Sequence, residues 1–506
     1  MVPPEPRFPD AREFIDQQGY FVLHAPRQTG KTTTLRILAK ALTAEGRYAA
    51  LHVTCEEAST AGDDYGAAMR ALRYALRKAA EQRLPAELQP PPFPDAPDEQ
   101  LLGAALGAWA HACPRPLVLF FDEIDALVGD AVTGVLRQLR AGFPERPEHF
   151  PWSIILCGMR DVRDYKLAAG GNPPRIGSAS PFNVKVESSR LGDFSEGEVR
   201  ALYAQHTADT GQPFTEAALA RAFELTAGQP WLVNALAREI IDKMKIPSLE
   251  PITVEHMDEA KERLILARAT HLDSLLARLT ESRVRRIVEP LIAGDVMHGD
   301  DLDDDVAYAR ALGLIARTNP VRIANPIYRE VIVRVLASAA EASITAEPRS
   351  FVLPDGRLAF KRLLREFAGF WTEHGLALQA AMPYHEAAPQ LVLMAWLQRL
   401  VNGGGYIDRE YGVGRGRVDL LVRWPYRRKD GTRALQRRAV EIKVWRPGQA
   451  DPLKRGLEQL DGYLGQMRLA RGVLVIFDRR KPGRAAAPRF EETRTPKGRT
   501  VRLLRA

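Results

Sequence analysis

The sequence predicts an α/β protein with at least two separate α/β regions, and three stretches support this prediction. Residues 20–36, YFVLHAPRQTGKTTTLR, are typical of a buried strand, a loop and an amphipathic helix. Residues 117–121, LVLFF, form the continuous apolar run of a parallel strand that is covered on both faces. Residues 439–444, AVEIKV, alternate as expected of a strand in a second sheet.

The loop after the first strand has the composition of a phosphate-binding P-loop. Its residues are Ala25, Pro26, Arg27, Gln28, Thr29 and Gly30, followed by Lys31, Thr32 and Thr33 at the start of the helix. Backbone N–H groups and the helix dipole would face the phosphates of ATP. Lys31 is expected to reach the β- and γ-phosphates, and the Thr32 hydroxyl to ligate Mg²⁺. Ala25 replaces the first glycine of the pattern, so we expect a slightly less permissive turn.

An acidic segment completes the expected ATP site. Asp122-Glu123-Ile124-Asp125 directly follows the apolar run at 117–121. Asp122 is expected to hold Mg²⁺ through water, and Glu123 to polarise the attacking water. A chance GKT sequence and solvated acids after a strand are the alternative interpretations. The occurrence of both motifs in one chain, each in its expected context, favours an ATPase.

The composition of the sequence limits the classes of protein to which the chain can belong. The 506 residues are 45% hydrophobic and 26% charged, which is typical of a globular protein of several domains. No run approaches the ~18 apolar residues of a membrane span, and the N-terminus has no signal pattern. The three cysteines, Cys55, Cys113 and Cys157, lie far apart and form neither a disulfide framework nor a metal-ligand spacing. We therefore expect a cytoplasmic protein with no membrane partner.

The distribution of charge favours nucleic acid as a partner. Residues 347–506 carry 32 Lys+Arg against 16 Asp+Glu, a net charge of +16, and the rest of the chain carries −8. A basic C-terminal third on an acidic body indicates an anionic partner, with DNA ahead of RNA. A surface that is arginine-rich for solubility alone is the alternative.

Four pieces of the sequence resemble one family. VLHAPRQTGKTT, LFFDEID, LCGMRD and GQPWLVNALA, in this order, are similar to a bacterial AAA-like ATPase of the signal-transducing and archaeal-type branch. The resemblance covers roughly residues 8–340. It implies a P-loop ATPase core at 1–190, a helical lid at 191–278 and a winged helix at 279–342. A capping box, Ser195-x-x-Glu198, is expected to begin a helix of the lid. The mixed charge of the winged helix favours packing on the ATPase over DNA binding.

The same resemblance suggests roles for two arginines. Arg160 follows the apolar strand at 152–157, where a polar residue commonly senses the γ-phosphate in related ATPases; an ion pair with Asp161 or Asp164 is the alternative. Arg175 lies in the turn-rich loop 170–181. It is a candidate arginine finger in a homo-oligomer, although no residue pattern indicates oligomerisation.

A second constellation occupies the last predicted domain, 346–506. Two amphipathic helices (358–369 and 386–401) precede a strand at 406–413, a strand at 418–424 that carries Asp419, and the strand at 439–444. Glu441 and Lys443 share one face of this last strand because side chains alternate. A helix with Gln459 and Tyr463 at i, i+4 and a strand at 472–477 follow. Asp419 and Glu441 would bind Mg²⁺, and Lys443 would position or deprotonate the attacking water.

This order of helix, three strands, helix and strand resembles the restriction-endonuclease-like core of the PD-(D/E)xK nucleases, including their Gln-x-x-x-Tyr subgroup. The resemblance implies that an acid on the first core helix also lines the metal site, a role that Glu386 fits. Pro389 places Glu386 in the first turn of that helix, and His385 beside it is expected to pack or cap. Five arginines near the site are expected to contact phosphates: Arg409, Arg415, Arg417, Arg446 and Arg455.

The sequence therefore predicts an α/β chain in which a P-loop NTPase parallel sheet, with its helical lid and winged helix, joins a restriction-endonuclease-like α/β domain. Its predicted cofactors are ATP and Mg²⁺, and its predicted action is on nucleic acid, in bacterial defence or mobile-element biology. One alternative is a signalling or assembly ATPase whose C-terminal domain binds nucleic acid or protein without cleaving it. Another is a motor that translocates along DNA.

Overall fold

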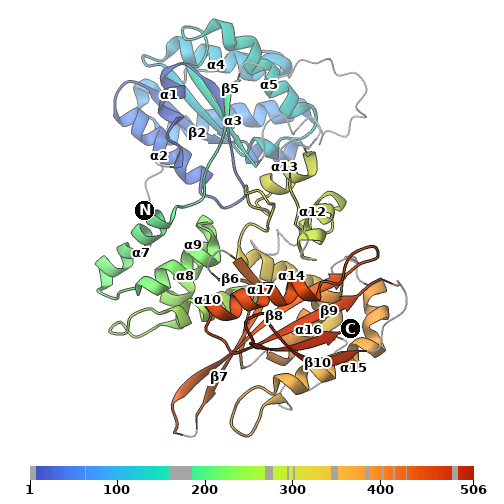
Figure 1. The fold of residues 1–506 in the computed structure, drawn as a ribbon. Coiled ribbons are helices and arrows are strands. Elements are labelled where there is room, and N and C mark those ends of the chain that lie inside the picture. The colour runs from blue at the N-terminus through green and yellow to red at the C-terminus, as the bar shows by residue number, and fades with distance from the viewer. Residues whose placement is uncertain are drawn as a thin grey trace. The chain divides into compact units, whose positions relative to one another are not determined.

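The computed structural model describes residues 7–62, 64–159, 185–267, 277–292, 296–299, 303–342, 351–381, 388–401, 404–413, 416–428, 430–480 and 488–506. These residues form two compact units (Figure 1), Met1–Leu264 with Arg310–Gly313 and Ile265–Ala309 with Leu314–Ala506. Each unit contains its own sheet. The α/β class expected from the sequence is confirmed for the N-terminal unit, and the C-terminal unit holds a second, mixed sheet. The finer division into four domains stays a prediction.

The N-terminal sheet is parallel throughout its five strands. These strands are β1 (Tyr20–His24), β2 (Ala49–Thr54), β3 (Leu117–Asp122), β4 (Ser153–Gly158) and β5 (Lys185–Arg190), in the order β2-β3-β4-β1-β5. The two motif-bearing strands, β1 and β3, both pair with β4 in parallel, so their carboxyl ends lie at the same end of the sheet. Open α/β sheets bind their ligands at the carboxyl ends of the strands.

Helices cover both faces of this sheet. One face packs against α1 (Ala11–Asp16) and α2 (Lys31–Ala44), through residues such as Ile15, Phe21 and Leu35. The other packs against α3 (Tyr65–Arg83), α4 (Leu101–Ala112) and α5 (Asp130–Gly142). Short 3₁₀ turns lie at Glu56–Ala61, Ala86–Leu88, Asp98–Gln100, Ile124–Ala126 and Phe143–Glu145. Both faces of β1 and β3 are therefore buried, as their continuous apolar runs predicted.

A helical segment follows the sheet, in the region where the lid is expected. Its elements are α7 (Glu196–Thr210), α8 (Glu216–Thr226), α9 (Pro230–Arg238), a π-helical turn (Glu239–Met244) and α10 (Val254–Leu266). The predicted capping box is confirmed: the Glu198 N–H donates to Ser195 Oγ, and the Ser195 N–H donates to the Glu198 carboxylate. Pro230 begins α9, and the Gln229 side chain caps it by accepting from the Leu232 N–H.

The C-terminal unit begins with α12 (Ser282–Ile292), α13 (Asp304–Ala311) and α14 (Pro326–Ala342). Antiparallel bridges join Met297 to Val321 and Ile315 to Ile323 ahead of α14. These helices lie within the range 279–342 expected for a winged helix, which stays a prediction. The helix α14 packs against α16 of the region that follows. No helix in the described parts of the chain is both long and apolar enough to cross a membrane.

The second sheet has six strands in the order β10-β11-β9-β8-β7-β6. Its elements are α15 (Phe360–Ala381), α16 (Ala388–Val401), β6 (Tyr406–Val413), β7 (Gly416–Arg427), β8 (Arg433–Trp445), α17 (Leu453–Gln466), β9 (Arg471–Asp478), β10 (Arg489–Arg494) and β11 (Thr500–Arg505). The helix α17 packs on one face through Leu460 and Leu464, and α15 packs on the other by placing Phe367 and Trp371 against Phe477. The expected order of helix, three strands, helix and strand is present, and β10 and β11 extend the sheet beyond it.

Gly228, between α8 and α9, provides a test of the fold. Its φ is +77°, and a Cβ there would lie 1.9 Å from the Phe194 carbonyl oxygen. Gly228→Ala is expected to cost about 3 kcal/mol or more of local stability, because the Phe194 backbone must move. Gly211 is the matched control, since its φ is +76° and nothing lies within 4 Å. Gly211→Ala is expected to cost only about 1 kcal/mol.

Hydrogen exchange of the amides in α7–α9 measures both costs, because it reports local opening free energies. Equal losses of protection in the two variants would show that the close approach of Phe194 does not constrain this turn.

Candidate functional site

The P-loop sequence forms a loop that leads into the N-terminus of α2. Gly30 is the residue before the helix and has φ +86°, a left-handed conformation that glycine adopts without strain. The Thr29 hydroxyl donates to the Pro26 carbonyl across the loop. Ala25 is fully buried at the end of β1, where its N–H donates to the Gly158 carbonyl. The extra methyl group of Ala25 is thus packed inside the protein.

Lys31 lies over this loop. Its Nζ donates to the carbonyl oxygens of Ala25 and Pro26, at 2.7 and 2.8 Å. Burial lowers the pKa of Lys31, and the carboxylates of Asp125 and Asp122 oppose this effect. A partly desolvated ammonium beside a helix N-terminus is suited to the phosphates of a nucleotide.

Asp122 is the link between β3 and the P-loop. It is 1% exposed, and its Oδ2 accepts hydrogen bonds from Thr32 Oγ1 at 2.6 Å and from His52 Nε2 at 3.0 Å. Burial opposes ionisation of Asp122, but these hydrogen bonds hold its pKa below the ordinary value. A hydroxyl and an ionised carboxylate in contact, beside a phosphate-binding loop, are the oxygen donors that suit Mg²⁺. These residues therefore fit a nucleotide with its magnesium ion.

His52 and Arg83 are parts of this site that sequence reasoning missed. The Arg83 guanidinium donates to His52 Nδ1 at 3.1 Å and to the His52 carbonyl at 2.7 Å. Since Nδ1 accepts this hydrogen bond, Nε2 carries the proton that is donated to Asp122. His52 faces α2 from the edge strand β2 and is 2% exposed. A lone histidine inside the segment ALHVT gave no sequence signal for this role.

Glu123 accepts a hydrogen bond from a residue of β2, the strand that also contains His52. Its Oε2 accepts a hydrogen bond from Thr54 Oγ1 at 2.6 Å, and its backbone has φ +57°. A non-glycine residue in this conformation is strained, and such strain is concentrated at functional sites. The Thr54 contact uses only one of the two carboxylate oxygens of Glu123. Arg160 and Arg175 lie outside the described residues.

Asp419, Glu441 and Lys443 come together in the C-terminal sheet. Lys443 Nζ donates to Glu441 Oε1 at 2.7 Å, and Asp419 Oδ2 accepts from the Ile442 N–H at 2.6 Å. Ala439 packs with α17, so Glu441 and Lys443 share the α17 face by strand alternation. Burial raises the pKa of Glu441 to about 8, with a contribution from the Asp419 charge, while Lys443 opposes the rise.

Two buried oxygens in this region have no hydrogen-bond partner among the described residues. They are Glu441 Oε2 and Gln459 Oε1. Buried polar atoms are nearly always paired, so an unpaired carboxylate oxygen beside a second carboxylate is a position that a cation would satisfy. Asp419 and Glu441 thus fit Mg²⁺ in donor type. The described residues contain no cluster of three or more His, Cys, Asp or Glu side chains around an ion position.

The remaining predicted residues lie on α17, after β8 or outside the described residues. Gln459 and Tyr463 are half-buried on α17, whose Leu460 and Leu464 pack on the sheet. Arg446 is half-buried after β8, and Arg455 is exposed on α17. Glu386 and Arg415 lie outside the described residues, as do the side chains of Arg409 and Arg417.

The contact between His52 and Asp122 yields a prediction. His52→Phe removes the donor to Asp122 Oδ2 and leaves this buried carboxylate with one hydrogen bond fewer. Loss of a charged hydrogen bond is expected to weaken the Mg²⁺-dependent part of ATP binding about tenfold. The measurement is ATP affinity with Mg²⁺ and with EDTA.

Thr43→Val is the control for this change, because Thr43 bonds to Ala50 on the same strand and does not contact Asp122. If Thr43→Val and His52→Phe weaken Mg²⁺-dependent binding equally, His52 acts only through the stability of β2.

A comparison with known protein families supports a nucleotide site in the N-terminal unit. Residues 13–165 match the family model described as an AAA domain. No curated protein matches the sequence significantly.

Three solved structures illustrate the structural likenesses. The Walker-type ATPase PABY2304 of Pyrococcus abyssi is 15% identical, with 66% of this chain and 96% of that chain covered and a TM-score of 0.47. The RuvB Holliday junction branch migration motor of Thermotoga maritima is 15% identical, with coverages of 65% and 92% and a TM-score of 0.35. The ORC1 protein of Aeropyrum pernix, in complex with DNA, is 12% identical, with coverages of 66% and 93% and a TM-score of 0.34.

The sequence identities and TM-scores of these three structures are too low to support a conclusion about function. The matched family model, by contrast, spans both nucleotide motifs, which the structure brings together through the contact between Thr32 and Asp122. The N-terminal part of this chain, residues 13–165, is an AAA-type P-loop ATPase domain.

Proposed function

We propose that this protein couples ATP binding and hydrolysis to metal-dependent cleavage of nucleic acid by its C-terminal domain. Lys31 and the N–H groups of the P-loop bind the phosphates, Thr32 and Asp122 hold the magnesium ion, and Glu123 orients the attacking water. When bound, this ion neutralises charge on the phosphates. The contact between His52 and Asp122 supports this assignment, because it helps to hold the pKa of this buried carboxylate below its ordinary value.

The observation that carries the cleavage proposal is the buried, half-satisfied carboxylate of Glu441. One of its oxygens accepts from Lys443, and the other has no partner among the described residues. A stabilising role alone does not explain this arrangement, since the uncompensated burial of a carboxylate costs free energy. Together with Asp419, Glu441 offers two hard oxygen ligands, and Lys443 lies beside them to neutralise charge on a phosphodiester.

The alternative is a C-terminal domain that binds nucleic acid or protein without cleaving it. The presence of only two candidate acid ligands, Asp419 and Glu441, in the described structure favours this reading. The position of Glu386, which would supply a third, is not described. Cleavage and binding alone make different predictions for the Glu441 variant.

The ATPase assignment predicts the effect of Lys31→Ala. Loss of the ammonium that contacts the Ala25 and Pro26 carbonyls of the P-loop is expected to reduce ATP hydrolysis at least about 100-fold, because this cation is expected to neutralise charge on the phosphates. Phosphate release at saturating Mg²⁺ measures this rate. Lys40→Ala is the control, since Lys40 is exposed on the same helix, and it is expected to hydrolyse ATP as the wild type does.

The nuclease assignment predicts the effect of Glu441→Gln. The amide keeps the shape of the side chain but is a poor Mg²⁺ ligand, so cleavage of a plasmid is expected to fall at least about 100-fold while ATP hydrolysis is unchanged. The control, Glu458→Gln, makes the same substitution at an exposed position on α17. Cleavage by Glu441→Gln at the wild-type rate would remove this site from the mechanism. DNA binding by the wild type without any cleavage would establish the alternative.

A further inference from the structure

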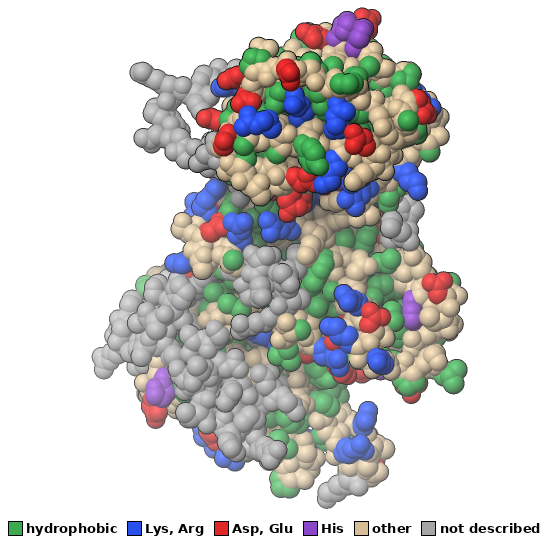
Figure 2. All heavy atoms as spheres, turned by 180° about the vertical axis from the view of Figure 1, so that it is seen from behind, with side chains coloured by type: hydrophobic (Ala, Val, Ile, Leu, Met, Phe, Trp, Pro, Cys, Tyr) green, Lys and Arg blue, Asp and Glu red, His purple; other side chains and the backbone are tan. Residues whose placement is uncertain are grey.

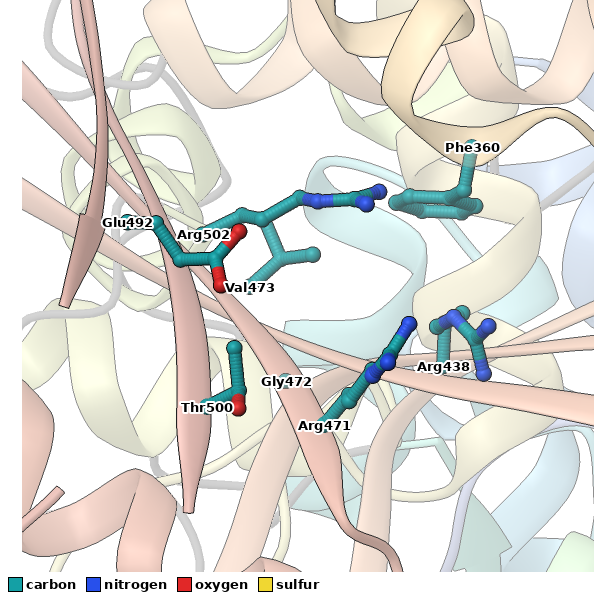
Figure 3. Close-up of a pocket in the computed structure, with 8 residues that line it drawn as sticks. All are labelled: Phe360, Arg438, Arg471, Gly472, Val473, Glu492, Thr500 and Arg502. Atoms are coloured by element: carbon teal, nitrogen blue, oxygen red, sulfur yellow. The ribbon is translucent and has the colours of Figure 1, made fainter. Parts of the chain in front are cut away.

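Three arginines line a small pocket on the face of the C-terminal sheet opposite to Glu441. Figure 3 shows Arg438 of β8, Arg471 of β9 and Arg502 of β11 around a cavity of about 80 Å³, below Phe360 at the start of α15. Strand alternation explains the placement, because Gly472 and Leu474 face α17 whereas Arg471 and Val473 face α15. The pocket is therefore separate from the candidate metal site.

The register of the strands brings these like charges together. Ala439 pairs with Gly472, so Arg438 and Arg471 are neighbours one residue earlier on the parallel strands β8 and β9. Arg502 pairs with Val473 on the other side of β9. Like charges at adjacent strand positions destabilise a sheet unless an opposite charge compensates them. Burial lowers the pKa of Arg438. The positive charges of Arg502 and Arg471 lower it further, as expected of neighbouring like charges.

Some other arginines of the same sheet have carboxylate partners, and those of the pocket do not. Arg423 of β7 pairs with Asp408, and Arg505 of β11 pairs with Asp451. By contrast, neither Arg471 nor Arg502 forms an ion pair or a side-chain hydrogen bond with any residue that the structure describes. Glu492 is the one acid in the lining. It lies opposite Arg502 on β10, and the Arg502 guanidinium extends away from it toward the Phe360 ring (Figure 3).

We propose that this pocket binds one phosphate group of a nucleic-acid backbone. A cavity of about 80 Å³ has room for a phosphate group. Guanidinium forks match the geometry of phosphate oxygens, and the Thr500 hydroxyl in the lining adds a donor. The excess of 32 basic over 16 acidic residues in 347–506 favours a polyanion as the source of the phosphate.

The arginine pocket differs in charge from the surface of the N-terminal unit. On the face of the N-terminal unit in Figure 2, basic and acidic side chains are interleaved. The arginine pocket has three cations and one acid. The inference rests on the proposed action of the C-terminal domain on nucleic acid, but it does not require cleavage, because the pocket and Glu441 lie on opposite faces of the sheet.

The test compares two double variants of the full chain, both in a Glu441→Gln background so that the DNA stays intact. The pocket variant is Arg471→Gln/Arg502→Gln, which leaves the half-buried Arg438 in place. The control is Arg433→Gln/Arg489→Gln, which removes the same charge at exposed positions of β8 and β10 in the same sheet. Fluorescence anisotropy of a labelled DNA duplex, titrated at several salt concentrations, gives the affinity and its salt dependence.

The pocket variant is expected to bind DNA about tenfold more weakly than the control, and the slope of log K against log salt is expected to fall by about one. Equal affinities and slopes for the two variants would overturn the proposal, even if the wild type cleaves DNA. Inorganic phosphate provides a second measurement. If it raises the unfolding temperature of the control but not of the pocket variant, while both bind DNA equally, the site takes a free phosphate and the nucleic-acid assignment is wrong.

Discussion

Burial of two carboxylates is the constraint on which both candidate sites depend. Asp122 is 1% exposed at the end of β3, and Glu441 is 2% exposed near the end of β8. Both residues lie in buried segments of their strands, so neither carboxylate is freely exposed to bulk water. A carboxylate in such a place must be compensated by donors or cations, or else it keeps its proton. The chemistry of each site follows from which compensation the protein provides.

The two carboxylates are compensated differently. Asp122 receives hydrogen bonds from Thr32 and His52, and its pKa stays below the ordinary value despite burial. Glu441 receives one from Lys443 and faces the charge of Asp419, and its pKa rises to about 8. The ATP site is thus organised by the protein's own donors. In the proposed mechanism a cation completes the C-terminal site, and the bound metal would then be part of its structure as well as of its chemistry.

Local patterns predicted the parts of these sites that are contiguous in sequence. The P-loop, the strand that ends at Asp122 and the strand of Glu441 were predicted because apolar runs and alternation identify buried strands. His52 was missed because its contact with Asp122 depends on the pairing of β2 with β3, which leaves no mark in the segment itself. The helix expected to end at Gly369 continues to Ala381 as part of α15, where packing against the sheet outweighs the low helix propensity of glycine. The arginines of the pocket come from three strands, β8, β9 and β11, and neither Arg471 nor Arg502 belongs to a predicted motif.

The central claim is that Glu441 and Asp419 form a cation site that Lys443 alone does not satisfy. Electron paramagnetic resonance of Mn²⁺ added to the full chain without nucleotide measures occupancy directly, because free Mn²⁺ gives the sharper signal. The wild type is expected to bind one Mn²⁺ that Glu441→Gln does not bind at the same concentration. Equal numbers of bound ions and equal affinities in the two proteins would contradict it.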